Sequence, residues 1–217
     1  AFAAGRVFYL ASKQPMTDTE LAEDQVELPL LAAPRAEVFL VETTEELEEA
    51  VATLAAAKGA FAVDAERASG FKYSQRAYLI QVYRAGSPIY LIDPAAIAPT
   101  TDRAPFVALA EVMSTAPWIL HAASQDIPCL RELGLEATAL FDTELGSRIA
   151  GLDRVGLGAV TEALLGVRLA KEHSAVDWST RPLANDWLNY AALDVDVLFD
   201  LWTAVEAVLI ERNKLSW

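Results

Sequence analysis

The fold of this chain follows from one short apolar run that ends in two carboxylates, Ala60-Phe-Ala-Val-Asp64-Ala-Glu66. The run carries no charge before Asp64, and this pattern predicts a buried strand. Two further apolar runs, Ala77 to Tyr83 and Ile89 to Ile92, are separated by a segment with Gly and Pro at 84–88, which predicts a turn between two strands. We therefore expect an antiparallel meander of three strands rather than a strand–helix–strand unit.

Helices and short strands are predicted on both sides of this meander. Thr43 and Glu46 form a capping-box pattern, which predicts a helix from about Thr44 to Lys58. After the meander we expect strands at 118–121 and 140–142, helices that begin after Asp102 and after Ser124, helices near 143–150 and 157–165, and one long last helix over 185–212. The predicted fold class is α/β, a mixed β-sheet of about five strands with the antiparallel meander at one side and helices on both faces.

Composition bounds the kind of protein. The 217 residues are 53% apolar and 22% charged, and 17 basic against 31 acidic residues give a net charge of −14. Such an acidic chain cannot bind phosphate backbones through its overall charge, so binding of nucleic acid would need a local basic strip or bound cations.

The single Cys129 excludes an internal disulfide and a zinc cluster of cysteines, and fits a cytoplasmic protein. We expect no membrane segment. Residues 1–36 lack periodicity, so we expect an N-terminal extension before one domain over 37–217.

Asp64 and Glu66 are the first candidates for chemistry. Residues two apart on a strand point to the same face, and two carboxylates at the end of a buried strand repel each other. A hard divalent cation with oxygen ligands would relieve this repulsion. The alternative is a strand end that continues into a solvated acidic loop.

Three more residues are candidates, each with a plainer alternative. Asp126 follows the expected Ser124 cap, where an acid is favoured by the helix dipole alone. Tyr190 and Asp194 are four apart on the expected last helix and are neighbours on one face, so they could form only a surface contact. Asp196 and Asp200 have the same spacing, and we interpret them as a solvated face.

Taken together, these five residues resemble a known pattern. Phe61-Ala-Val-Asp64-Ala-Glu66, then His121-Ala-Ala-Ser-Gln-Asp126, then Tyr190-Ala-Ala-Leu-Asp194 resemble the three motifs of the DEDD superfamily of 3′–5′ exonucleases, and the Tyr before the last Asp resembles its DEDDy branch. Leu79-Ile-Gln-Val82, Tyr90-Leu-Ile-Asp-Pro94, Asp142-Thr143, Asp177-Trp178 and Arg181-Pro-Leu183 look like ribonuclease D in particular. Ala65, where the family usually has Thr, and Arg67 depart from the pattern without removing a ligand.

The resemblance implies a ribonuclease H-like fold with two divalent metal ions, Mg²⁺ or Mn²⁺. Asp64, Glu66 and Asp194 would hold one ion, Asp64 and Asp126 the second, and Tyr190 would orient the attacking water. The implied activity is a 3′–5′ exoribonuclease that releases nucleoside 5′-monophosphates from single-stranded RNA 3′ ends, in RNA decay or in processing such as that of transfer RNA. We expect a monomer with no protein partner, and the helical nucleic-acid-binding domains of the family have no counterpart here. A 3′–5′ DNA exonuclease and a non-catalytic RNA-binding module on the same fold are the alternatives.

The remaining polar and aromatic residues receive plainer interpretations. The best candidates for a strip that binds phosphates are the basic residues near the motifs, Arg67, Lys72, Arg76, Lys171 and Arg181. We interpret His121 as a hydrogen-bonded structural residue, His173 as solvated, and Cys129 as buried. Trp178 and Trp187 could stack on bases, and core packing is the expectation for both.

Overall fold

The central sheet has six strands in the order β2-β5-β4-β3-β6-β7. The computed structural model describes residues 27–68, 70–100, 102–170 and 176–216. The strands are β2 (Val38–Val41), β3 (Phe61–Arg67), β4 (Ala77–Arg84), β5 (Ile89–Ile92), β6 (Trp118–Leu120) and β7 (Leu140–Asp142). The meander is confirmed, since β4 pairs antiparallel with both β3 and β5. The parallel strand β2 was not predicted. Because β2 lies beyond β5, the meander is inside the sheet and not at its side.

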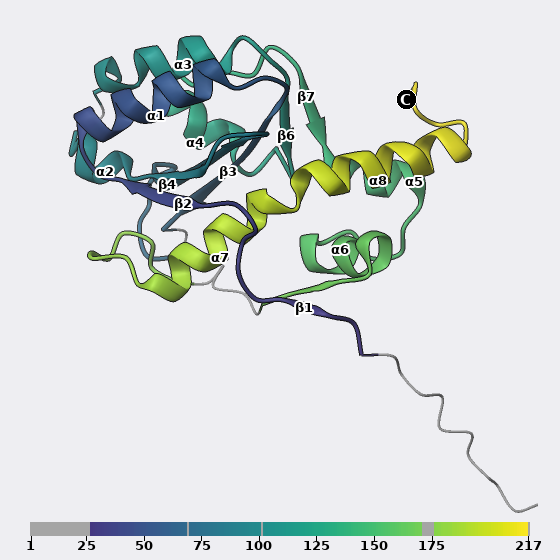
Figure 1. Cartoon of the computed structure of the whole chain (residues 1–217). Helices are drawn as coiled ribbons and strands as arrows, with labels where there is room; N and C mark the ends of the chain where they lie inside the picture. Colours follow the sequence, from purple (N-terminus) through teal and green to yellow (C-terminus); the bar gives the residue numbers. More distant parts are fainter. Residues whose placement is uncertain (1–26, 69, 101, 171–175, 217) are drawn as a thin grey trace, which may run out of the picture.

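Helices cover both faces of this sheet, as expected for a mixed α/β fold (Figure 1). One layer is formed by α1 (Thr44–Ala56), the short α2 (Pro94–Ile97), the 3-10 turn η1 (Ala104–Phe106), α3 (Val107–Met113) and α4 (Ile127–Glu132). The other layer is formed by α5 (Thr143–Ala150), α6 (Leu157–Leu165), α7 (Asn185–Asp196) and α8 (Leu198–Glu211). Alternate residues of β3 serve the two cores, because Val63 packs on the first side and Ala62 on the second. Among the described residues no helix is both long enough and apolar enough to cross a membrane.

Part of the expected N-terminal extension lies on the domain. Leu30–Leu31 forms β1, which pairs in parallel with β8 (Arg168–Leu169) in a separate two-stranded sheet. Residues 1–26 lie outside the described residues.

One helix starts where its capping residues predict, and another starts later than predicted. The capping box of α1 is present, with the Thr43 hydroxyl 3.2 Å from the Glu46 amide nitrogen. The helix expected after Ser124 instead starts at Ile127, and Asp126 occupies its N-cap position. Ala122 has a left-handed φ of 60° in the preceding turn, and Pro128 lies in the first helical turn, where Pro is favoured. These two features move the helix start past Ser124.

The predicted last helix is two helices, α7 and α8, which meet at Val197. The Arg35 guanidinium donates to the Asp196 carbonyl oxygen at 2.6 Å and to the carboxylates of Asp196 and Asp200. A side chain that inserts into the helical hydrogen-bond ladder is a common cause of such a break. The prediction that Asp196 and Asp200 form a solvated face is therefore wrong for Asp196, which is only 2% exposed.

Helices α5 and α8 pack closely at a glycine. A Cβ atom on Gly146 would lie 2.8 Å from Val205 Cγ1 and 3.4 Å from Phe141 Cζ. Val205 is fully buried on α8, and its branched side chain has one strongly preferred rotamer in a helix. The packing of the second layer therefore requires glycine at this position.

We expect Gly146→Ala to lower the free energy of unfolding by about 1 kcal/mol, and by at most about 2 kcal/mol, because the overpacking costs about 1–3 kcal/mol and the gain in helix propensity returns about 1 kcal/mol. Gly158 in α6 is the matched control, since a Cβ there would meet no atom within 4 Å. Gly158→Ala should be neutral or stabilising. Urea titrations of both variants measure the difference, and equal stability of Gly146→Ala and wild type would contradict the close approach.

Candidate active site

Four carboxylates and one phenol line a single cavity of about 320 Å³. Asp64 and Glu66 come from β3, Asp126 from the start of α4, and Tyr190 and Asp194 from α7. Ligand oxygens of Asp64, Glu66 and Asp194 all lie within 4.8 Å of one another. The structure thus brings together all five predicted residues, although they span 130 positions of the chain. The donor set contains oxygen only, which suits a hard divalent cation such as Mg²⁺ or Mn²⁺.

The two carboxylates of β3 are placed by strand alternation and by the helix that covers them. Asp64 and Glu66 project to the same side as Ala62, which packs in the core beneath α7 and α8. On α7, Asp194 lies one helical turn after Tyr190 and is 7% exposed. A second cavity of about 560 Å³, bounded by the start of α6, shares Leu157, Tyr190 and Asp194 with the first. The carboxylates therefore lie in an extended cleft.

Asp126 is placed by a turn that a distant residue holds. Asp142 at the end of β7 accepts hydrogen bonds from the amides of Ala122 and Ala123, both at 3.0 Å, and from the amide of Glu144 at 2.9 Å. The last of these caps α5, and an Asp before a helix is a cap signal that the sequence carries. The other two fix the turn between β6 and α4, and they depend on β6 and β7 being neighbours. This second role of Asp142 was not predicted.

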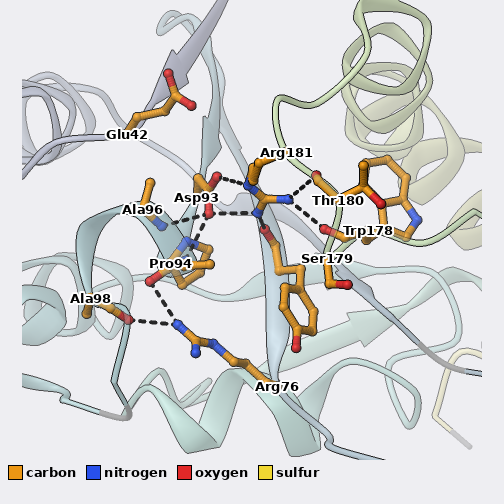
Figure 2. Close-up of polar contacts among 12 residues, drawn as sticks. Glu42, Arg76, Asp93, Pro94, Ala96, Ala98, Trp178, Ser179, Thr180 and Arg181 are labelled. Carbon is orange, nitrogen blue, oxygen red and sulfur yellow. Dashed lines mark hydrogen bonds and ion pairs between the residues drawn. The ribbon is translucent and has the colours of Figure 1, made fainter. Parts of the chain in front are cut away.

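Arg181 holds the segment that leads into α7 (Figure 2). Its guanidinium forms a bidentate pair with Asp93, at 2.5 and 2.8 Å. It also donates to the carbonyl oxygens of Tyr78, Trp178 and Thr180 at 2.7–2.8 Å. All five N–H groups of the guanidinium are thereby used, and Asp93 is completely buried. The prediction that Arg181 binds phosphate is wrong, because its donors are directed into the protein.

The predictions for Arg76 and Trp178 can be compared with the contacts of these side chains. Arg76 donates to the carbonyl oxygens of Pro94 and Ala98 (Figure 2) and to that of Pro99, so it closes the end of α2 rather than adding to a phosphate strip. Trp178 is fully buried and packs against the rings of Trp187 and Tyr190, with centroids 5.6 and 6.5 Å apart. The expected core role of Trp178 is confirmed. Lys171 and His173 lie outside the described residues.

Comparison with known proteins agrees with this geometry. The pattern of the 3′–5′ exonuclease domain family matches residues 38–210. The chain belongs to this family. It is 34% identical to ribonuclease D of Acidiphilium cryptum over 183 residues, which are 83% of this chain and 45% of that protein. It is 36% identical to ribonuclease D of Haemophilus influenzae over 77% of this chain and 40% of that protein. The chain thus spans less than half the length of these relatives.

Solved structures give the same relationship. A protein from Bifidobacterium adolescentis is 46% identical, with a TM-score of 0.81 over 88% of this chain and 46% of that one. Ribonuclease D of Escherichia coli is 27% identical, with a TM-score of 0.64 over 82% of this chain and 49% of that one. The predicted family and the predicted α/β exonuclease fold are both confirmed.

The carboxylates of this exonuclease domain are strained electrostatically when no cation is bound. Burial raises the pKa of Asp64 to about 6. Burial, and then repulsion from Asp64, raise the pKa of Asp126 to about 9. Burial and the charges of Asp64, Asp194 and Asp126 raise the pKa of Glu66 well above its usual value. The cationic Arg67 partly offsets these shifts. Without a cation, protons must therefore take the place of positive charge in the cleft.

Tyr190 remains a neutral phenol in this environment. Burial is the largest cause of its raised pKa, followed by the negative charge of Asp194 and by hydrogen bonding with that carboxylate. A phenolate is thus disfavoured at neutral pH, and the side chain is available as an O–H group.

Two buried polar side chains beside the carboxylates were not predicted as part of the site. Gln81 on β4 is directly opposite Asp64 in the antiparallel pair and fully buried, and its amide group has no hydrogen-bond partner among the described residues. His121 lines the cavity. Its Nδ1 lies 2.9 Å from the Thr143 hydroxyl, and its Nε2 is buried. The expectation of a hydrogen-bonded His121 thus holds for one ring nitrogen.

The raised pKa of Asp126 predicts a pH-dependent instability of the metal-free domain. The pKa of about 9 in the folded protein lies above the unfolded value of about 3.9, so the folded state binds more protons and stability falls as pH rises between the two. Asp126→Asn should therefore raise Tm in EDTA at pH 8 by at least about 2 °C, which corresponds to roughly 1 kcal/mol for a domain of this size. At pH 4 the two proteins should unfold at similar temperatures.

The control for this experiment is Asp153→Asn, which changes an exposed acid and should leave Tm unchanged at both pH values. Added Mn²⁺ should stabilise wild type more than Asp126→Asn, because the ion binds the folded carboxylate site. A variant that is no more stable than wild type at pH 8 would contradict the electrostatic strain.

Proposed function

We propose that this domain is a 3′–5′ exoribonuclease that hydrolyses the last phosphodiester bond of RNA and releases nucleoside 5′-monophosphates. The observation that carries the proposal is the cluster of Asp64, Glu66 and Asp194 oxygens within 4.8 Å, with Asp126 and Tyr190 in the same cavity. The relatives named ribonuclease D support RNA as the substrate. We further propose that the protein acts as a cytoplasmic monomer in RNA processing or decay.

The carboxylates would serve as ligands for two divalent ions. Asp64, Glu66 and Asp194 would hold one ion, and Asp64 together with Asp126 the other. A pair of such ions supplies an activated water and neutralises the leaving oxygen of a phosphodiester. The chain itself supplies the fixed oxygen ligands and a partly enclosed cleft. Until cations bind, the carboxylates repel the phosphate backbone, so substrate and metal binding should depend on each other.

Tyr190 would position the attacking water. Its raised pKa makes it a poor general base at neutral pH. A phenol can both donate and accept a hydrogen bond, and its ring is held against buried Trp178 at a centroid distance of 6.5 Å. Positioning, rather than proton removal, is therefore the role that fits this side chain.

Labelled RNA tests direction, product and metal dependence together. With Mg²⁺ or Mn²⁺, RNA labelled at its 5′ end should give a ladder of products shortened from the 3′ end, and EDTA should abolish it. RNA labelled at its 3′ end should release labelled mononucleotide at once. A 3′-phosphate should slow digestion strongly, because the added charge lies against the carboxylates.

DNA of the same sequence distinguishes the main alternative, since the 2′-hydroxyl separates the two strands. Faster digestion of DNA would favour a DNA exonuclease. Metal binding without any hydrolysis would favour a non-catalytic RNA-binding module, and internal cleavage would contradict an exonuclease of either kind.

Substitutions on α7 separate metal binding from water positioning. Asp194→Asn should abolish activity and weaken Mn²⁺ binding in calorimetry, because it removes a charged ligand but keeps the shape. Tyr190→Phe should bind Mn²⁺ and RNA nearly as well as wild type, with kcat lower by about 10²–10⁴-fold. Asp186→Asn, which changes an exposed acid on the same helix, should behave as wild type. Normal turnover in Tyr190→Phe would contradict the assignment to the tyrosine branch.

A further inference from the structure

Two aromatic side chains are exposed at the tip of the loop between β3 and β4. Tyr73 is completely exposed and Phe71 is 54% exposed, and they belong to a run of six exposed residues, 70–75. Aromatic side chains are usually largely buried, because each carries a large apolar surface. Their exposure on one loop indicates a surface that is covered when a partner binds.

The exposed residues 70–75, which follow β3 beyond the rim of the catalytic cavity, are called the aromatic loop. Arg67, at the end of β3, lines the cavity with Asp64 and Glu66. Its guanidinium also donates to the Gln75 side-chain oxygen at 3.1 Å, which ties the end of the loop to the rim. The amides of Phe71 and Lys72 donate to the carbonyl oxygen of Ala68, at 3.0 and 2.9 Å. The base of the loop is thus anchored beside the carboxylates while its aromatic tip projects outward.

The charges of the aromatic loop favour a polyanion at this place. Lys72, which lies between Phe71 and Tyr73 in the sequence, is exposed, and Arg67 partly offsets the charge of the cleft carboxylates. The chain as a whole has a net charge of −14. Once divalent ions neutralise the carboxylates, a phosphate backbone that enters the cleft passes Arg67 and Lys72, and an acidic protein needs such local cations to bind RNA.

We propose that the aromatic loop binds single-stranded RNA upstream of the 3′ end, with bases stacked on Tyr73 and Phe71 and the backbone near Lys72. The proposal rests on the proposed exoribonuclease function. Stacking on aromatic rings accepts every base, because every base has a π face. Tyr73 comes six positions after Arg67, so the tip lies at most about 20 Å from the rim. Because the terminal nucleotide must reach the carboxylates of the cleft, we assign the aromatic loop to nucleotides a short distance upstream.

RNA length and missing bases test this site. On a long single-stranded RNA, Tyr73→Ala should raise KM about ten-fold, the loss expected for one stacked base, with kcat unchanged. Tyr73→Phe should retain the wild-type KM because it keeps the ring. A dinucleotide, which ends before the aromatic loop, should be cleaved equally by all three proteins. Ile210→Ala removes an exposed apolar side chain on α8 (57% exposed) and should leave every parameter unchanged.

Abasic RNA identifies the base as the group that Tyr73 contacts. If the nucleotides upstream of the scissile bond lack bases, the KM of wild type should rise at least to the value that Tyr73→Ala has on intact RNA, and wild type and Tyr73→Ala should have the same KM on the abasic RNA. An equal loss by Tyr73→Ala on dinucleotide, abasic and intact RNA would overturn the site, because the loop would then only support the cleft. An unchanged KM on intact RNA would also overturn it and leave a protein partner as the reason for the exposed rings.

These outcomes are distinct from failure of the proposed function. Wild type that cleaves neither dinucleotide nor long RNA would contradict the exoribonuclease. Wild type that cleaves both, with Tyr73→Ala indistinguishable from it, would contradict the aromatic loop alone.

Discussion

The structure depends on holding several carboxylates together against their mutual repulsion. Asp64, Glu66 and Asp194 present oxygens within 4.8 Å of one another, and Asp126 lies in the same cavity. Burial adds to the repulsion, so the pKa of these groups rises where it is perturbed. Such an arrangement persists only when rigid surroundings prevent the side chains from moving apart. A bound divalent cation would relieve this repulsion, and the site therefore favours cation binding.

The rigidity comes from contacts that surround the cleft rather than from the cleft itself. Helix α7 is held at both ends, because Arg181 ties the preceding segment to Asp93 and Arg35 binds Asp196 at its last turn. Both acids are almost completely buried. Loss of one partner from a buried pair leaves an uncompensated charge, so each pair strongly favours the one position of α7 that brings its functional side chains to β3.

Short-range sequence patterns are enough to specify the local parts of this site. Period-two alternation placed Asp64 and Glu66 on one face of a strand, and helical spacing placed Tyr190 and Asp194 on one face of a helix. The meander and the cap of α1 followed from short-range patterns of the same kind. These features are predictable because every interaction that specifies them lies within a few residues along the chain. The family resemblance added the expectation that Asp126 would join them.

Contacts between distant segments establish which polar groups face the cleft and which face the protein interior. Arg181 and Asp93 are 88 residues apart, and Arg35 and Asp196 are 161 apart. No local pattern distinguishes an arginine that fills its donors with carbonyl oxygens from one that binds phosphate, because both need the same side chain. In the same way, Asp142 reaches the turn before Asp126 only because β7 pairs with β6 in the sheet. These choices depend on contacts between distant segments, and such contacts exist only once the chain has folded.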